Sequence, residues 1–363
     1  MSSTQLPGLN LPYPVAVEAG SLANAGEFSR RVAPAFRYAI ITDSQVGPLY
    51  AATVADSVGV SHDDILAVPA GEASKTRGSW GWLTDELLSR NFGRDSAIIA
   101  LGGGVVGDLA GFVAATYMRG IPIVHIPTTL LAMIDSAIGG KAGVDTPSGK
   151  NMVGAFHQPN GVLVDTQVLA TLRLKELRTG FAEALKHGVI ADRGYFESVV
   201  ESIPAIVYSV AEAGDRVSDL VVGSIGIKAG IVSRDEHEGG LRKVLNFGHT
   251  AGHAVETLSG FRISHGEAVA IGMVIEGRIA ELAGIAEKGT AETIRSAVAG
   301  AGLPVARPAG MDADRMLEMM RTDKKVRGGT IQYTLPATIG KMAASDSGWT
   351  VSVDDEIVRE VLT

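Results

Sequence analysis

The segment NFGHTAGHAVE at residues 246–256 contains three side chains that can bind a metal ion or move a proton. His249 and His253 are four residues apart, and Glu256 follows three residues later. On a helix, these spacings place all three side chains on one face. Paired histidines at this spacing can bind zinc, but many such pairs are surface or capping residues. The segment alone therefore leaves open a metal site, a proton-transfer site and a polar helix face.

Two other segments offer ligands of the same kind. GFAEALKHG places Glu183, Lys186 and His187 on one helical face, and SHGEAVAIGM puts His265 just before a helix. The chain has no cysteine, so a metal site must use histidine and carboxylate ligands. One glutamate with two histidines is a catalytic zinc set that leaves a coordination position open for substrate. Taken singly, Glu183 could be a solvated helix acid and His265 a helix cap.

A glycine-rich turn follows the apolar run 96–102 and has the pattern Gly102-x-Gly104-x-x-Gly107. Glycines between a strand and a helix let the backbone approach a pyrophosphate, although a turn without a ligand is the alternative. An acid that holds the ribose hydroxyls should follow after the next strand, but the segment there, HIPTT, has none. Asp43, after an earlier strand, is the better candidate, and it favours NAD over NADP. We therefore expect a strand order unlike that of an ordinary Rossmann domain.

Basic and amide side chains gather in glycine-rich and polar segments of a chain whose net charge is −8. They are Arg119, Lys141, Lys150, Asn151, Lys228, Arg242, Asn246, Lys324 and Lys325. Such residues flanked by glycines indicate a site for phosphate or carboxylate groups, although any one of them could be solvated surface.

The order of apolar patterns predicts how these residues are positioned. Apolar runs without alternation predict buried parallel strands, at 37–42, 64–70, 96–102, 121–127 and 161–166, with helices near 46–58, 77–90 and 106–118. Helical spacing then recurs at 176–190, 216–233, 248–259, 266–283, 289–300 and 311–321, before one strand at 330–336. We expect an α/β, Rossmann-like N-terminal domain over 1–175 and a mostly α-helical C-terminal domain over 176–363.

Composition narrows the class of protein. The net charge of −8 gives no support for binding to nucleic acid or an anionic membrane. The N-terminal residues lack the basic and apolar regions of a signal peptide. The most apolar region, 97–118, contains Asp108 and several glycines, so it cannot be a membrane-spanning helix. We therefore expect a cytoplasmic protein.

Several motifs together resemble the 3-dehydroquinate synthase family. They are GGGVVGDLAGFVAATYMRG, IPTTLLAMIDSAIGGKAGVDTPSGKNMVGAFHQP, GFAEALKHG, GLRKVLNFGHTAGHAVE, HGEAVAIGM and DKKVRGG, in order between about residues 40 and 340. The wider superfamily of sugar phosphate cyclases shares many of them, and glycerol dehydrogenases share some more distantly. The resemblance implies a dehydroquinate synthase-like fold, with an NAD-binding domain and a helical metal-binding domain, and usually a homodimer.

The family resemblance also implies a reaction. It is the conversion of 3-deoxy-D-arabino-heptulosonate 7-phosphate (DAHP) to 3-dehydroquinate and phosphate in the shikimate pathway to aromatic amino acids. The implied steps are transient oxidation by NAD, β-elimination of phosphate, reduction and an intramolecular aldol reaction. The alternatives are another sugar phosphate cyclase, a metal- and NAD-dependent polyol dehydrogenase, or an inactive scaffold protein.

The family pattern assigns roles to residues of this chain. It implies that Glu183, His249 and His265 bind one Zn²⁺ or Co²⁺ ion, and that His253 assists proton transfer. The implied substrate contacts are Arg119, Asp135, Lys141, Lys150, Asn151, Lys186, Lys228, Arg242, Asn246 and one of Lys324 or Lys325. The implied cofactor contacts are Asp43, Glu72, Lys75, Gly104, Val105, Val106, Gly107, Asp108, Thr128, Thr129, Lys141, Lys150, Val168, Leu169, Ala170 and Thr171.

Four positions depart from the common family pattern. Gln45 stands where the family often has Asn, and Met133 replaces a common Gln. Ala142 replaces a common Thr and Asp145 a common Asn. These departures concern details of cofactor and substrate contact and leave the implied catalytic set intact.

Overall fold

The computed structural model describes residues 6, 8–322, 331–345 and 348–363. The chain divides into two compact units, Met1–Leu172 and Arg173–Thr363. The roles expected for the two domains, cofactor binding in the first and metal and substrate binding in the second, stay predictions.

The first unit is an α/β unit. Its elements are β1 (Val15–Val17), η1 (Ser21–Asn24), α1 (Ala25–Val32), β2 (Arg37–Asp43), η2 (Gly47–Ala51), α2 (Ala52–Val58), η3 (His62–Asp64), β3 (Ile65–Val68), η4 (Glu72–Ser74), α3 (Arg77–Ser89), β4 (Ser96–Gly102), α4 (Gly104–Thr116), η5 (Tyr117–Arg119), β5 (Ile123–Pro127), η6 (Ala132–Ser136), β6 (Lys141–Thr146), β7 (Gly149–Phe156), β8 (Gly161–Val164) and η7 (Thr166–Thr171). All five expected strands are present, as β2, β3, β4, β5 and β8. The sequence did not predict β1, which is three residues long, or the β6–β7 hairpin, which is rich in glycine and charge.

The main sheet is parallel and has the order β1-β8-β5-β4-β2-β3. Without β1, its strands taken in chain order run 2-1-3-4-5, whereas an ordinary Rossmann domain runs 3-2-1-4-5-6. The expected departure from Rossmann strand order is therefore confirmed. In this arrangement the direction of winding reverses between β2 and β4, and ligands of open α/β sheets bind outside the carboxyl ends of strands at such a point.

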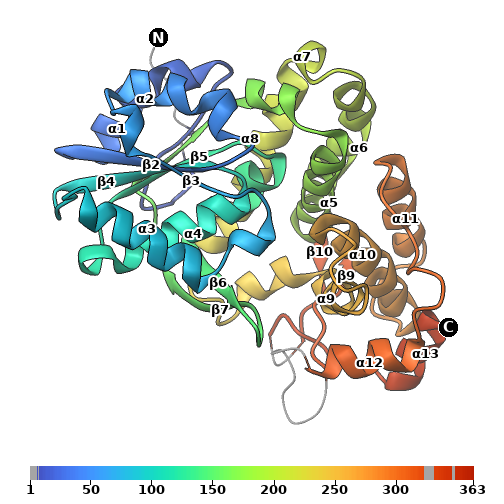
Figure 1. Cartoon of the computed structure of the whole chain (residues 1–363). Helices are drawn as coiled ribbons and strands as arrows, with labels where there is room; N and C mark the ends of the chain where they lie inside the picture. The colour runs from blue at the N-terminus through green and yellow to red at the C-terminus, as the bar shows by residue number, and fades with distance from the viewer. Residues whose placement is uncertain (1–5, 7, 323–330, 346–347) are drawn as a thin grey trace. The chain divides into compact units, whose positions relative to one another are not determined.

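Two helices cover one face of the sheet. Helices α3 and α4 lie on one side of the strands, and α1 and α2 lie on the other (Figure 1). The core on the α3–α4 side includes Ile41 and Ile98 from the strands and Leu83 and Leu109 from the helices, all of them buried. Strands buried on both faces explain why the sequence shows continuous apolar runs instead of alternation.

The second unit is mostly helical. Its elements are α5 (Leu174–Ala191), α6 (Arg193–Tyr208), α7 (Val210–Ala213), α8 (Asp215–Val232), η8 (Leu241–Asn246), α9 (His249–Leu258), α10 (His265–Leu282), α11 (Thr290–Gly300), α12 (Ala313–Thr322), β9 (Pro336–Thr338), β10 (Lys341–Met342) and α13 (Asp355–Leu362). All six expected helices are present, whereas α6, α7 and α13 were not expected. Within the described residues of both units, no helix is long and apolar enough to cross a membrane.

The strand expected at 330–336 is wrong over most of its length. Residues 331–335 form no ladder, and Tyr333 makes only an isolated bridge with Val351. The short strand β9 begins at Pro336, and residue 330 lies outside the described residues. The apolar residues of this segment pack into the helical core instead, since Ile331, Tyr333 and Leu335 are buried there.

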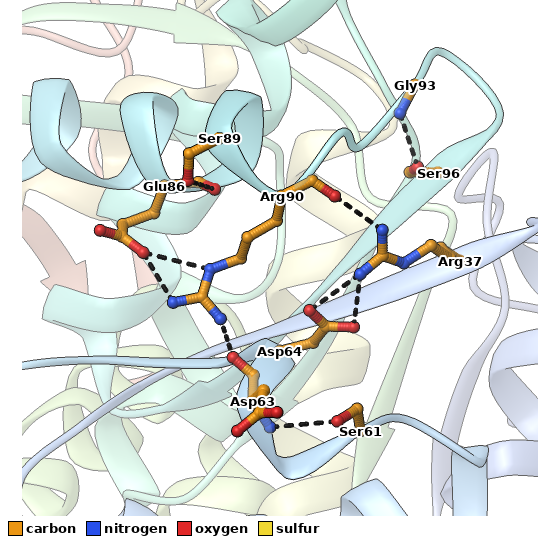
Figure 2. Close-up of polar contacts among 9 residues, drawn as sticks. All are labelled: Arg37, Ser61, Asp63, Asp64, Glu86, Ser89, Arg90, Gly93 and Ser96. Atoms are coloured by element: carbon orange, nitrogen blue, oxygen red, sulfur yellow. Dashed lines mark hydrogen bonds and ion pairs between the residues drawn. The ribbon is translucent and has the colours of Figure 1, made fainter.

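A cluster of polar side chains joins the amino ends of three neighbouring strands (Figure 2). Arg37, at the start of β2, donates to both carboxylate oxygens of Asp64, at 3.0 and 2.8 Å, just before β3. It also donates to the carbonyl oxygen of Arg90, at 2.7 Å, in the segment that leads to β4. The Arg37 guanidinium lies 4.2 Å from the centre of the Phe92 ring. Asp64 is buried, so its ion pair is less screened than a surface pair.

We expect Asp64→Asn to destabilise the first unit by about 1–2 kcal/mol, because the substitution removes a charge-assisted, two-bond contact. Urea denaturation at neutral pH measures this loss. The matched control is Asp63→Asn, since Asp63 is exposed and offers Arg90 only its main-chain carbonyl. Equal denaturation midpoints for the two variants would contradict a stabilising role for the ion pair.

Candidate active site

Helix α5 carries a glutamate that is completely buried. Glu183 is 0% exposed, and no hydrogen bond to either carboxylate oxygen is found within the described part of the chain. Its Oε2 atom forms an ion pair with Lys186, which is also buried and lies one turn further along α5. A buried carboxylate is costly unless a cation or a metal ion compensates its charge. This position therefore favours metal binding over the solvated helix acid that the sequence left open.

Two histidines face the same oxygen of this carboxylate. The Nε2 atoms of His249 and His265 each lie 3.8 Å from Glu183 Oε1. This is too long for a hydrogen bond, but atoms that share one zinc ion at about 2 Å are themselves roughly 3–4 Å apart. The three side chains form a group whose ligand atoms lie within 4.8 Å of one another. Their donor set and spacing fit one divalent metal ion.

The other ring nitrogens have partners that orient the two imidazoles. His249 Nδ1 lies 3.2 Å from the carbonyl oxygen of Phe247, and His265 Nδ1 lies 3.7 Å from Glu256 Oε2. Burial lowers the pKa of His265, but Glu256 and Glu183 outweigh that effect and raise it above its usual value. Histidine ligands commonly donate their second N–H to a carbonyl or carboxylate, which turns the free nitrogen toward the metal.

His253 does not join this group. It is exposed, and its ring centre lies 5.4 Å from that of His249 and 6.4 Å from that of His265. It thus lies beside the ligand cluster, where a proton-transfer residue could reach a bound molecule.

Glu256 was quoted in the sequence motif but was not assigned a role. Its spacing from His249 and His253 along one helical face was the signal that could have identified it.

Other residues expected to contact substrate lie in the same unit. Lys228 and Arg242 are buried. Arg242 follows a loop that Asp235 organises, because the Asp235 carboxylate accepts the backbone N–H groups of Gly239, Gly240 and Arg242 at 2.7–2.9 Å. Asn246 Nδ2 donates to Glu238 Oε1 at 2.6 Å. Glu238 has a left-handed backbone with φ of 60°. Lys324 and Lys325 lie outside the described residues.

The first unit also carries expected substrate contacts. Arg119 and Asn151 are exposed and have left-handed backbones, with φ of 70° and 52°. Lys141 is exposed at the start of β6, and Asp135 is half-buried in η6. The structure therefore places these side chains on the loops and hairpin that follow β4 and β5.

An ionic cluster gathers four of the expected cofactor contacts. The Lys75 Nζ atom lies 2.9 Å from Glu72 Oε1 and 3.3 Å from Asp108 Oδ2. Lys150 Nζ lies 3.7 Å from the same Glu72 oxygen. Burial lowers the pKa of Lys75, but Asp108 and Glu72 raise it above its usual value. Burial raises the pKa of Asp108 to about 6, although Lys75 opposes that shift.

Asp145 belongs to the same cluster. Its Oδ1 atom lies 3.8 Å from Lys75 Nζ and accepts the backbone N–H of Asn151 at 2.8 Å. Burial raises the pKa of this carboxyl group above its usual value. Of the other positions that depart from the family pattern, Met133 is buried in η6. Ala142 packs closely against Gly111 of α4, since a Cβ atom added to Gly111 would lie 2.9 Å from the Cβ atom of Ala142. Gln45 is exposed and donates its backbone N–H to Asp43.

The remaining expected cofactor contacts follow the carboxyl ends of the strands. Asp43 ends β2, and its Oδ1 accepts the backbone N–H groups of Gln45 and Val46 at 2.8 and 2.9 Å. Strand β4 pairs with β2 and leads into the glycine turn, where α4 begins at Gly104. The N–H of Thr128 donates to the carbonyl oxygen of Gly102 at 2.9 Å, at the end of β5. The sheet thus brings Asp43, the turn and Thr128 to neighbouring strand ends, at the point where its winding reverses.

The segment of Val168, Leu169, Ala170 and Thr171 follows β8 as the short helix η7. Val168 and Leu169 are buried, whereas Ala170 and Thr171 are exposed. Tyr50 connects this segment to the loop after β2, because its hydroxyl lies 2.7 Å from Thr171 Oγ1. The segment is therefore held near the carboxyl ends of the strands, where Asp43 also lies.

Solved structures with this fold include two sugar phosphate cyclases. A 2-deoxy-scyllo-inosose synthase, solved with carbaglucose-6-phosphate, NAD⁺ and Co²⁺, is 26% identical over 99% of each chain, with a TM-score of 0.89. The 2-epi-5-epi-valiolone synthase of Streptomyces hygroscopicus subsp. jinggangensis 5008, solved with NAD⁺ and Zn²⁺, is 26% identical over 100% of this chain and 98% of that one, with a TM-score of 0.86. A probable glycerol dehydrogenase of Sinorhizobium meliloti 1021, at 15% identity and a TM-score of 0.64 over 96% of this chain and 94% of its own, shares the fold alone. The fold is that of the sugar phosphate cyclases.

Similarity in sequence identifies a narrower family than the fold does. The models for the 3-dehydroquinate synthase N-terminal and C-terminal domains match residues 65–179 and 180–326. The 3-dehydroquinate synthase of Symbiobacterium thermophilum is 45% identical over 92% of this chain and 93% of its own length. That of a Synechococcus species is 41% identical over 99% of this chain and 98% of its own. The chain belongs to the 3-dehydroquinate synthase family.

The different positions of His265 and His253 generate a prediction. After a chelator removes bound metal, we expect His265→Ala to lose binding of added Zn²⁺ or Co²⁺, because one of three ligands is missing. His253→Ala should bind the metal as the unmodified protein does and lose catalytic rate only. Metal titration against a colorimetric chelator measures both affinities. Metal binding retained by His265→Ala, or catalytic activity retained after complete metal removal, would contradict the assignment.

Proposed function

We propose that the chain converts DAHP to 3-dehydroquinate and phosphate. The observation that carries this proposal is the 40–45% identity to 3-dehydroquinate synthases over nearly the full length of the chain. The identity to the solved inosose and valiolone synthases is only 26%. The enzyme is accordingly a carbon–oxygen lyase that eliminates phosphate, and its substrate is a small sugar phosphate.

Two cofactors belong to this proposal. We propose that Glu183, His249 and His265 hold one Zn²⁺ or Co²⁺ ion, since their geometry fits one ion and the solved cyclases contain these metals. We propose that NAD⁺ binds at the strand ends that carry Asp43 and the glycine turn. When bound, NAD⁺ takes up and returns a hydride, and the metal ion polarises the oxygen of the reacting carbon.

The remaining side chains bind and orient the substrate in this proposal. The cationic groups of Lys186, Lys228 and Arg242 match a phosphate dianion and a carboxylate, because charge-assisted hydrogen bonds to such groups are strong. Arg119, Asp135, Lys141, Lys150, Asn151 and Asn246 supply further polar contacts, together with Lys324 or Lys325. His253 moves a proton between the substrate and solvent. Holding the flexible carbon chain of the substrate in position for ring closure lowers the activation barrier of that step by several kcal/mol.

A polyol dehydrogenase is a weaker alternative. A polyol carries no anionic group, so it would form no charge-assisted hydrogen bonds with these cationic side chains. The proposal also includes assembly as a homodimer and location in the cytoplasm. It includes no binding to nucleic acid or membranes, which the net charge of −8 supports.

The role of NAD distinguishes a cyclase from a dehydrogenase. In the proposed reaction the hydride returns to the carbon from which it came, so NAD is regenerated in each turnover. We expect substoichiometric NAD to support many turnovers, with phosphate release equal to DAHP loss and no steady rise in NADH absorbance. A dehydrogenase would consume NAD one for one and release no phosphate. Stoichiometric NADH, or no phosphate from DAHP, would overturn the proposed function.

Asp43 should set the choice between NAD and NADP. Its carboxylate would accept hydrogen bonds from the ribose hydroxyls and repel a 2′-phosphate, so NAD should bind much more tightly than NADP. Asp43→Asn keeps an oxygen for the N–H groups of Gln45 and Val46 but removes the charge. We expect about tenfold weaker NAD binding and a smaller difference between the two nucleotides. Fluorescence titration measures both affinities, with Asp56→Asn as the control, since the Asp56 side chain is exposed on α2. NADP binding as tight as NAD binding in the unmodified protein would refute this assignment.

A further inference from the structure

Helix α9 begins at a proposed metal ligand and has no cap of its own. His249 is its first residue, and the preceding Gly248 has no side chain and a left-handed φ of 80°. The first N–H groups of a helix have no partner within the helix, and they must find one when water is excluded. The start of α9 therefore needs an acceptor from another element.

Water is excluded there because α9 and α10 are in backbone contact. A Cβ on Gly272 would overlap the carbonyl oxygen of Gly248, and a Cβ on Gly252 would lie 2.9 Å from the carbonyl oxygen of Ala268. Only glycine fits at such a close approach. Gly248 and Gly252 flank His249, whereas Gly272 follows His265 by two turns of α10. The crossing that aligns the two histidine ligands is therefore tightly packed.

Glu276 of α10 supplies the missing acceptor. Its Oε2 atom accepts the N–H of Gly248 at 2.7 Å, and its Oε1 atom accepts the N–H of Ala251 at 2.9 Å. The side chain is 0% exposed, so both bonds are shielded from solvent. A carboxylate at a helix N-terminus is also stabilised by the helix dipole. One side chain of α10 thus acts as the cap of α9.

We propose that Glu276 is a positioning residue for the metal centre. It is not one of the three proposed ligands, but it ties the first turn of α9, which carries His249, to the helix that carries His265. Loss of this tie would let His249 move relative to His265 and Glu183. This inference rests on the proposed metal centre and extends it to a residue outside the ligand set.

The test compares Glu276→Gln with the unmodified protein. The glutamine amide keeps one acceptor oxygen, but its NH₂ group faces a backbone donor. We expect Zn²⁺ affinity, measured by chelator competition, to fall about 10- to 100-fold, as for other changes that disorient metal ligands. The visible absorption of bound Co²⁺ should also change, because that band reports ligand geometry. Glu276→Asp, which keeps the charge on a shorter arm, should recover part of the affinity.

A matched control separates positioning from general stability. Asp354 caps α13 in the same unit by accepting the N–H of Glu356. Asp354→Ala should lower the denaturation midpoint as a lost cap does, with Zn²⁺ affinity and the Co²⁺ spectrum unchanged. Glu276→Gln with unmodified affinity and spectrum would overturn the positioning role. Absence of metal binding by the unmodified protein would overturn the metal centre, and the positioning role with it.

A second measurement uses the unmodified protein and does not depend on the folding of a variant. Hydrogen exchange followed by mass spectrometry over overlapping peptides reports the amides of Gly248 and Ala251 in metal-free protein. We expect both to be protected as strongly as amides in the middle of α10. Exchange at the rate of an exposed loop would show that Glu276 does not hold them, and the proposal would fall.

Discussion

The helical unit depends on one buried charge. The Glu183 carboxylate is fully removed from solvent, and the two Nε2 atoms and one lysine that face it come from α5, α9 and α10. An isolated carboxylate in such a place is unfavourable by several kcal/mol, so the surrounding helices must bring compensating groups to it. The glycine contacts between α9 and α10, the cap from Glu276 and the Glu256–His265 pair all serve the alignment of these groups. A divalent ion at this position would complete the compensation.

The α/β unit has stabilising polar contacts at one end of its sheet and the residues proposed to bind the cofactor at the other. At the amino ends, Arg37 joins neighbouring strands by an ion pair with Asp64 and a hydrogen bond to the carbonyl oxygen of Arg90. At the carboxyl ends, the glycine turn, Asp43 and the Lys75 cluster present polar groups where a parallel sheet with this strand order binds ligands. In the first set, Arg37 and Asp64 balance each other's charge. The second set concentrates three carboxylates around Lys75.

The sequence predicted the elements with strong apolar periodicity, and the family pattern supplied most residues that are proposed for the candidate site. All five buried strands and six helices were found, because a continuous apolar run or a helical stripe is a local signal. The β6–β7 hairpin was not predicted because its glycines and charged residues interrupt the alternation that is typical of a strand. The strand predicted at 330–336 was wrong because the apolar residues of that segment pack on helices. Spacing alone could not separate His249 from His253, and the family pattern was needed to do so. No local sequence pattern indicated the role of Glu276, because the amides that it binds lie 25 and 28 residues away in the chain.

Two proposed substrate contacts, and one residue that binds a third, have left-handed backbones that residues other than glycine rarely adopt. Arg119 and Asn151 have φ of 70° and 52°, and Glu238, which binds Asn246, has φ of 60°. Each such conformation costs about 1 kcal/mol relative to a relaxed backbone. Glycine would relieve that cost but would remove the functional side chain. These positions thus impose a trade-off between thermal robustness and function, so a lineage adapting to heat would have to gain its stability elsewhere in the chain.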